Sequence, residues 1–308
     1  MGFICPEYNT IKSQISRYIK KQLPPDIVTF DEIPDESEYY INERNENFMI
    51  FKNSNIIIFQ SPFQTELFIK YNENIFADGT FYIAPIFSYQ VFITRAYVPE
   101  INSFYTTSLS ILRNKEQVTY ELLFEELKKN ACKYNNNIII TPKILHCDFE
   151  KGISNAAIKI FPNISIKYCI WHYKRSLEVQ KNKLCHNEVE YNYNIYLFYK
   201  AINNFPFINP EYIFDIYNYI KIICQAKNYF HFLKFLEYFK KTYLYNYDIQ
   251  RWNYYNDINH ITNNASESFN NYLKKLFHKK PSFYELIYHL KKEESLSYNN
   301  YQRKIGGV

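Results

Sequence analysis

Three acidic residues, far apart in the sequence, each stand where a carboxylate could bind a metal ion. Asp78 and Asp148 each follow a short apolar run, and Glu267 stands in the first turn of a helical pattern. Hard divalent cations such as Mg²⁺ prefer clustered carboxylates. Two such ions about 4 Å apart can activate a nucleophile and stabilise the leaving oxygen during phosphodiester cleavage. These residue types therefore predict metal-dependent phosphoryl chemistry, provided that folding brings the three acids together.

Two glycines stand close to the first two acids. The chain has only five glycines, and Gly79 and Gly152 are the ones beside Asp78 and Asp148. Glycine is favoured where the backbone turns tightly or approaches another group closely. We therefore expect a local steric constraint next to each of these acids.

Each acid also has a purely structural interpretation. Asp78-Gly79 could form a two-residue hairpin turn. Asp148 could cap the helix that follows it, and Asn264 with Glu267 resembles a capping box. The apolar pattern continues past Gly79 through Thr80 and Phe81, which favours an acid inside a strand over one in a turn.

Composition indicates a folded intracellular protein. The chain of 308 residues is 47% hydrophobic and 19% aromatic, which is enough to bury a substantial core. No apolar run approaches the roughly 20 residues of a membrane span. The net charge of +5 permits a nucleic-acid partner without requiring one. The six cysteines form no C-x-x-C pair and indicate reduced thiols: Cys5, Cys132, Cys147, Cys169, Cys185 and Cys224.

The order of the predicted elements indicates a mixed sheet. We expect strands at residues 56–59, 75–84, 89–97, 104–112, 143–147 and 164–170, and helices at 116–130, at 151–160 and from 172 onward. Strands that can pair by hairpins, followed by alternating helix and strand, are typical of an α/β, ribonuclease-H-like core with helices on a mixed sheet. In this topology the strand before Asp148 lies beside the strand that contains Asp78.

Strand signals largely disappear after Cys185 and aromatic residues take helical spacing. We therefore expect an all-helical insertion before the last acid, with Trp252 packed inside. The predicted organisation is an N-terminal helical and irregular segment (1–54), the first part of the core (55–184), the insertion (185–257), the end of the core with Glu267 (258–300) and a tail (301–308). The acidic residues 31–46 are expected to form an irregular surface connection.

The segment Cys169-Ile170-Trp171-His172 follows the last predicted strand. Cys-x-x-His supplies half of a zinc site, and no second pair with suitable spacing is nearby, so a packed or DNA-contacting pair is favoured over structural zinc. His146 is expected to pack within its strand. Basic residues near the acids are either solvated helix faces or DNA contacts, and the candidates for phosphate binding are His172, Lys174, Arg175, Lys274 and Lys275.

The ordered set of motifs resembles the Mutator-like element (MULE) transposases. It comprises Asp78-Gly79-Thr80-Phe81, Asp148-x-Glu150, Cys169-x-x-His172, Trp252-Asn253 and Thr262-Asn263-Asn264-x-x-Glu267. The similarity spans about residues 55–295. It implies that Asp78, Asp148 and Glu267 form a DDE triad that binds Mg²⁺ or Mn²⁺ on a ribonuclease-H-like fold. It also implies cleavage of phosphodiesters at transposon ends and strand transfer into target DNA.

Two departures from the family pattern affect this expectation. Ile261 stands where family members commonly have an arginine, and no zinc-binding DNA-recognition module precedes the core. The alternative is therefore a domesticated or truncated transposase-derived protein that binds DNA or a protein without cutting. A ribonuclease-H-like nuclease without strand transfer would share the same chemistry. The implied partners are DNA and a second copy of the chain, with no membrane, and the implied location is the nucleus, although the sequence has no clear localisation signal.

Overall fold

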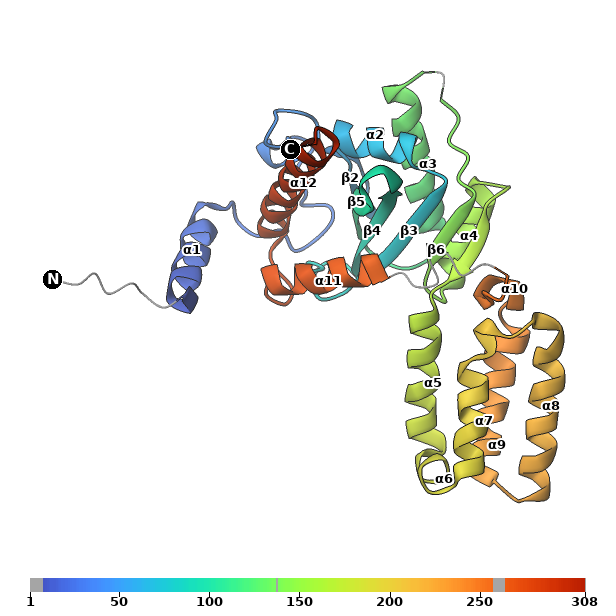
Figure 1. Cartoon of the computed structure of the whole chain (residues 1–308). Coiled ribbons are helices and arrows are strands. Elements are labelled where there is room, and N and C mark those ends of the chain that lie inside the picture. The colour runs from blue at the N-terminus through green and yellow to red at the C-terminus, as the bar shows by residue number, and fades with distance from the viewer. Residues whose placement is uncertain (1–7, 137, 257–263, 308) are drawn as a thin grey trace. The chain divides into compact units, whose positions relative to one another are not determined.

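The computed structural model describes residues 8–136, 138–256 and 264–307. Its strands form one seven-stranded sheet in the order β1-β2-β5-β4-β3-β6-β7 (Figure 1). The pairs β1/β2, β2/β5 and β4/β5 are antiparallel, whereas β3/β6 and β6/β7 are parallel. The strands are β1 (Met49–Lys52), β2 (Ile56–Phe59), β3 (Asn74–Thr80), β4 (Gln90–Val98), β5 (Ser103–Leu112), β6 (Ile144–Cys147) and β7 (Ser165–Tyr168).

Helices flank this sheet and make up the rest of the regular structure. The longer ones are α1 (Tyr8–Gln22), α2 (Pro62–Lys70), α3 (Gln117–Tyr134), α4 (Lys151–Ile160), α5 (Ile170–Leu184), α7 (Tyr193–Asn203), α8 (Pro210–Ala226), α9 (Phe230–Phe239), α11 (Asn264–Leu276) and α12 (Phe283–Ile305). Shorter helical segments are η1 (Glu38–Tyr40), η2 (Pro99–Ile101), α6 (His186–Tyr191), η3 (Phe205–Phe207), the π-helical η4 (Lys240–Tyr245) and α10 (Ile249–Trp252).

The chain divides into two compact units. The first unit comprises Met1–Tyr71, Gly79–Ile140 and Phe269–Val308, and the second comprises Asn72–Asp78 and Thr141–Ser268. Because side chains alternate along a strand, the first unit has two packed sheet faces. One face, with Val91 and Ile93 of β4, packs against α11, α12 and the N-terminal segment. On the other face Phe92 contacts Tyr120 of α3.

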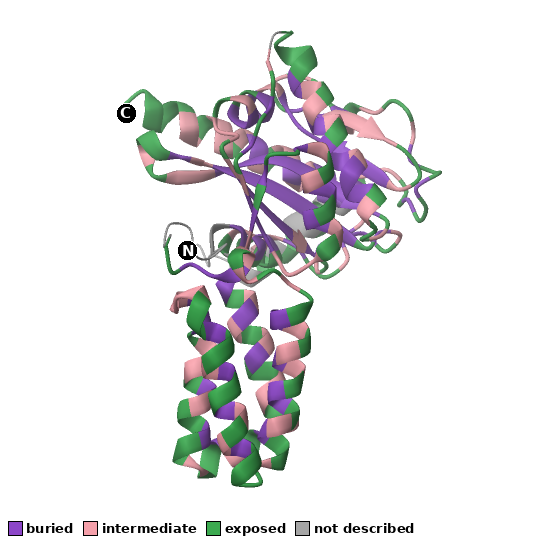
Figure 2. Ribbon diagram, turned by 90° about the vertical axis from the view of Figure 1, so that its right-hand side faces the viewer, coloured by how far each residue is buried: buried purple, intermediate pink, exposed green. Residues whose placement is uncertain are grey.

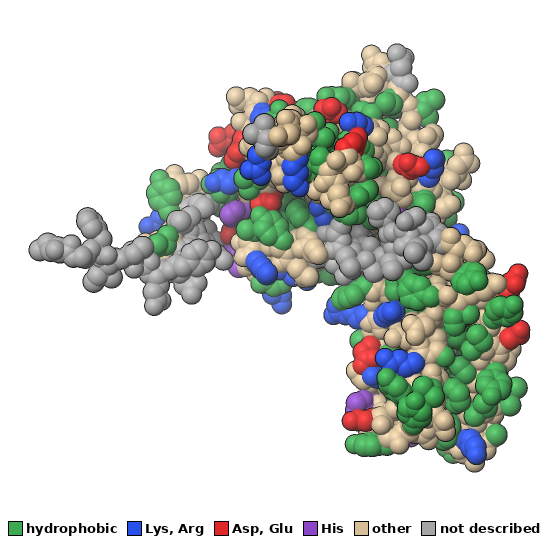
Figure 3. Space-filling view, in the orientation of Figure 1, with side chains coloured by type: hydrophobic (Ala, Val, Ile, Leu, Met, Phe, Trp, Pro, Cys, Tyr) green, Lys and Arg blue, Asp and Glu red, His purple; other side chains and the backbone are tan. Residues whose placement is uncertain are grey.

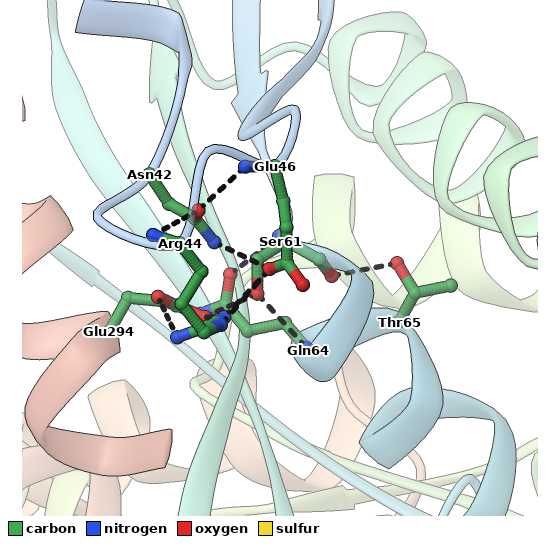
Figure 4. A network of polar contacts seen from close by, with 7 residues as sticks. All are labelled: Asn42, Arg44, Glu46, Ser61, Gln64, Thr65 and Glu294. Carbon is green, nitrogen blue, oxygen red and sulfur yellow. Dashed lines mark hydrogen bonds and ion pairs between the residues drawn. The ribbon is translucent and has the colours of Figure 1, made fainter. Parts of the chain in front are cut away.

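A network of polar contacts connects α12 to other segments of the first unit (Figure 4). Arg44 donates two hydrogen bonds to the carboxylate of Glu294, at 2.6 and 3.2 Å. Ser61, which caps the N-terminus of α2, donates its hydroxyl to the same carboxylate at 2.5 Å. The Glu294 side chain is fully buried, so its charge depends on these donors.

The second unit contains β6, β7 and α4 together with the helices α5 to α10. Its helices bury one side against one another and expose the other (Figure 2). Trp252 has no exposed surface and stacks on Tyr173 of α5, with ring centroids 5.4 Å apart. Hydrophobic side chains also lie on the outer surface of these helices (Figure 3). Tyr191, Tyr193 and Ile222 are among the exposed ones.

The predicted fold class is confirmed as a mixed α/β sheet flanked by helices, consistent with a ribonuclease-H-like fold. The described residues between 185 and 256 contain helices and no strand, as expected, and Trp252 is packed inside. The helical layer starts earlier than predicted, because α5 packs against α9. The five-segment organisation stays a prediction. No helix in the described ranges is long and apolar enough to cross a membrane.

Three local expectations differ from the structure. The strand predicted to reach residue 84 ends at Thr80, and β1 and α2 were not predicted. The acidic segment 31–46 is not wholly on the surface, because Ile33 and Tyr40 belong to the core of the first unit.

Candidate active site

Strand pairing brings Asp78 and Asp148 to the same end of neighbouring strands. In the parallel pair β3/β6, Asn74 is aligned with Ile144 and Phe76 with His146, a constant offset of 70 residues. The paired residues end at Phe76 and His146. Asp78 and Asp148 each lie two residues further along, toward the carboxyl ends of these parallel strands, and Asp148 directly follows the last residue of β6.

Phe76 and His146 share one face of the sheet. Their rings are stacked, with centroids 4.4 Å apart and an interplanar angle of 7°. Asp78, two residues further along β3, returns to that face, and Asp148 directly follows the end of β6. Asp78 is buried within β3, at 6% exposure, and the Asp148 side chain is 28% exposed. Asp78 is therefore a strand residue and not part of a hairpin turn.

His146 is packed as predicted. Its ring is buried against Phe76, and its Nε2 lies 3.0 Å from Oδ1 of Asn74.

Aromatic packing fixes the short loop that carries Asp148. The ring of Phe149 stacks on Tyr168 at 4.7 Å and meets the edges of Tyr243 and Tyr247. The Tyr247 hydroxyl donates a hydrogen bond of 2.8 Å to the carbonyl oxygen of Phe149. These contacts connect the loop to the helical layer of the same unit, so the helices help to hold Asp148 in place.

His172 lies directly against Asp148. Its Nδ1 is 2.8 Å from Oδ1 of Asp148, and the two form an ion pair. Burial alone would lower the pKa of His172, but hydrogen bonds with Asp148 and Cys169 outweigh it and raise the pKa to about 10. The imidazole is therefore positively charged at neutral pH.

The two cysteines beside this pair are buried. Burial, reinforced by the negative charge of Asp148, raises the pKa of the Cys147 thiol and keeps it protonated. Cys169 is the residue before the first turn of α5, and its backbone N–H donates to the carbonyl of Cys147 at 3.0 Å. Both cysteines therefore have a packing role in this structure.

Asp78 and Asp148 provide some, but not all, of the oxygen ligands expected for a hard cation. Two carboxylates at the same end of neighbouring parallel strands present oxygen ligands, which Mg²⁺ and Mn²⁺ prefer. Within the described ranges, no three His, Cys, Asp or Glu side chains form a group that could hold a metal ion. The described residues thus supply two of the three expected acids.

Comparison with family models gives one match over this region. Residues 75–176 match the model of the MULE transposase domain. This stretch is similar to MULE transposase domains. It contains Asp78, Asp148 and His172, and the resemblance predicted from the motifs is confirmed. Comparison with curated proteins gives no significant match.

The third predicted acid lies beyond the transposase-domain match. Glu267 belongs to α11, a described helix, but its side chain is outside the part of the chain that the structure describes, as are Thr262 and Asn263. Its role as the last member of a triad stays a prediction.

The predicted DNA-binding residues lie on two helices. His172, Lys174 and Arg175 lie on α5 within the matched stretch, with Arg175 exposed and Lys174 over the ring of Phe207 at 5.4 Å. Lys274 and Lys275 are exposed in the last turn of α11, where cations also favour the helix dipole. Lys167, another basic residue near Asp148 in sequence, donates to the carbonyls of Gln250 and Asn253.

Two residues near the predicted motifs were not singled out from the sequence. Trp171, inside the Cys-x-x-His segment, is partly exposed. Arg95 is buried in β4, donates to the carbonyl of Phe104 at 2.8 Å and lies 4.7 Å from the ring of Phe269. Burial lowers the pKa of Arg95 to about 10. The available signal was a charged residue within the otherwise uncharged strand pattern from Val91 to Tyr97.

Proposed function

We propose that this chain is the catalytic core of a DDE-type DNA transposase, with Asp78, Asp148 and Glu267 as its acidic triad. The observation that supports the proposal is the parallel pairing of β3 and β6, because Asp78 lies in β3, Asp148 directly follows β6, and both lie in the stretch similar to MULE transposase domains. The proposed substrates are transposon-end DNA and target DNA, and the proposed location is the nucleus.

The carboxylates would hold Mg²⁺ or Mn²⁺, and a bound ion supplies activation of the attacking oxygen and stabilisation of the leaving oxygen. Asp78 would act from a buried strand position that fixes its direction. Asp148 would act from a loop fixed by Phe149, with one oxygen oriented by His172. These acids bind cations and do not transfer protons, so amides cannot replace them.

The proposed reaction has two steps on DNA. Water cleaves the phosphodiester at the element end and leaves a 3′-hydroxyl. That hydroxyl then attacks a phosphodiester of target DNA, one bond forming as another breaks. The basic side chains of α5 and α11 would contact the phosphate backbone, which positions DNA without reading its sequence.

The test is a cleavage assay with the full chain. Supercoiled plasmid and a labelled oligonucleotide with a free 3′-hydroxyl are incubated with Mg²⁺, Mn²⁺, Ca²⁺ or EDTA. We expect nicking and joining of the oligonucleotide with Mg²⁺ or Mn²⁺, little with Ca²⁺ and none with EDTA. Nicking without joining would identify a nuclease. DNA binding without either reaction would support the alternative, a transposase-derived binding module.

A further inference from the structure

Trp171 is partly exposed at the start of α5, where its neighbours are buried. Cys169, Ile170 and Tyr173 are each at most 3% exposed, whereas Trp171 is 37% exposed. The chain has two tryptophans, and the other, Trp252, is fully buried in the helical layer. An indole at the surface offers a flat, polarisable face for stacking.

A continuous series of contacts connects this indole to the candidate catalytic carboxylate. The guanidinium of Arg175, one helical turn further along, lies 4.7 Å from the Trp171 ring. The ring of Trp171 meets the ring of His172 edge to face, with centroids 4.7 Å apart. His172 in turn pairs with Asp148 at 2.8 Å. One side chain, His172, therefore separates Trp171 from Asp148, and two separate Arg175 from it.

We propose that Trp171 and Arg175 form a stacking platform for an unpaired nucleobase of the DNA that is cut beside Asp148. The platform rests on the proposed function, because it assigns a substrate feature to the same site. Bases inside a duplex keep both faces covered by their neighbours, so a base must leave the stack to reach the indole.

The surrounding charges favour a nucleotide over an apolar peptide. His172, Lys174 and Arg175 are basic, and the adjacent base and phosphate of one nucleotide could contact the indole and these cations together. Aromatic stacking contributes about 1–3 kcal/mol per base, and an arginine beside the ring adds a cation–π contribution. A planar guanidinium can also stack on a base, which a lysine ammonium cannot.

The platform can be tested by binding in EDTA, without cleavage. Two oligonucleotides are compared: a hairpin with a fully paired stem closed by a non-nucleotide polyethylene glycol linker, and the same hairpin with one unpaired thymine in the stem. Because Trp252 is buried, quenching of tryptophan fluorescence by iodide reports on Trp171. We expect the unpaired base to protect Trp171 from iodide and to tighten binding about fivefold or more, the factor that corresponds to ~1 kcal/mol.

Variants separate stacking from general DNA affinity. Trp171→Ala should remove the preference for the unpaired base and leave hairpin affinity nearly unchanged, whereas Trp171→Phe should retain most of it. Arg175→Lys should weaken the preference more than the affinity. Tyr191→Ala is the matched control, since Tyr191 is an aromatic residue 82% exposed on α6; it should change neither. Circular dichroism confirms that each variant is folded.

Two results would overturn the platform. These are equal affinity of the wild-type chain for both oligonucleotides, and an undiminished preference in Trp171→Ala. Failure of the proposed function has a different signature, because a chain that prefers the unpaired base but never cuts with Mg²⁺ or Mn²⁺ retains the platform and loses the transposase activity.

Discussion

The missing side chain of Gly79 leaves space for the buried side-chain amide of Gln90. A Cβ atom added at Gly79 would collide with the side chain of Gln90, which provides all three of its nearest atoms. Gln90 is buried, and its Nε2 donates to the Tyr120 hydroxyl at 2.6 Å. The constraint expected at Gly79 is therefore a close approach of a side chain, not a turn, since Gly79 lies within β3.

Gly79→Ala should lower the free energy of unfolding by about 1–3 kcal/mol, because Gln90 must give up its position and its hydrogen bond. Urea unfolding measures this. In a Gln90→Ala background the same substitution should cost close to nothing, which isolates the pairwise effect. An equal loss in both backgrounds would show that Gln90 is not the cause.

Sequence patterns predicted the strands next to the first two acids but not the side chain that pairs with Asp148. The apolar runs before Asp78 and Asp148 form β3 and β6, and these strands are neighbours as the predicted topology required. The pairing of His172 with Asp148 depends on how α5 leaves β7, which no local pattern encodes. Trp171 was not assigned because a tryptophan in a helix is usually buried, as Trp252 is here.

Among the elements, α12 shows how a buried charge holds a helix in place. Arg44 pairs with Glu294 and lies 4.1 Å from the ring of Tyr298, so one loop residue contacts two positions of this helix. Removing Arg44 leaves the Glu294 carboxylate buried with Ser61 as its remaining described donor. An unpaired buried charge is costly.

Arg44→Met should therefore lower the free energy of unfolding by about 3–5 kcal/mol. Lys129→Met is the control, because the Lys129 side chain is 59% exposed and solvent screens its pair with Glu126, so the loss of stability should be much smaller than for Arg44→Met. The double variant Arg44→Met with Glu294→Leu should recover part of the loss. Denaturant midpoints of the four proteins decide the matter, and similar losses for Arg44→Met and Lys129→Met would contradict the assigned role.

Element boundaries were predicted correctly where the local sequence pattern is clear and were missed where it is weak. The predicted helix at 151–160 and the predicted strand at 56–59 match α4 and β2. Helix α2 was missed because it buries Gln64 and Thr65 along with its apolar residues, which hides the amphipathic pattern. Its capping box, Ser61 with Gln64, was the signal available in the sequence.

At the scale of the whole molecule, charge governs how the chain meets DNA. The net charge is +5, and the described basic candidates lie on surfaces of α5 and α11. Such contacts recognise phosphate and not base sequence. We expect weak binding with little sequence preference.

If about four phosphates are neutralised, affinity should fall about 100-fold between roughly 50 and 200 mM salt. The double variant Lys274→Gln with Lys275→Gln should release about two fewer counterions, so the plot of log affinity against log salt concentration should have a smaller slope. Fluorescence anisotropy with several unrelated duplexes measures both. A strong preference for one duplex at physiological salt would reveal a base-reading element.

The central claim is that Asp78 and Asp148, positioned by β3 and β6, act with Glu267 in metal-dependent cleavage of DNA. The most direct measurement is the initial rate of plasmid nicking in Mn²⁺ or Mg²⁺ for Asp78→Asn, Asp148→Asn and Glu267→Gln. Glu125→Gln, at an exposed position of α3, is the control. Loss of metal binding removes several kcal/mol of transition-state stabilisation, so each triad variant should be slower by about 100-fold or more, with DNA affinity retained. Wild-type nicking by Asp78→Asn or Asp148→Asn would contradict the assignment of the site, and wild-type nicking by Glu267→Gln would reduce Glu267 to a helix cap.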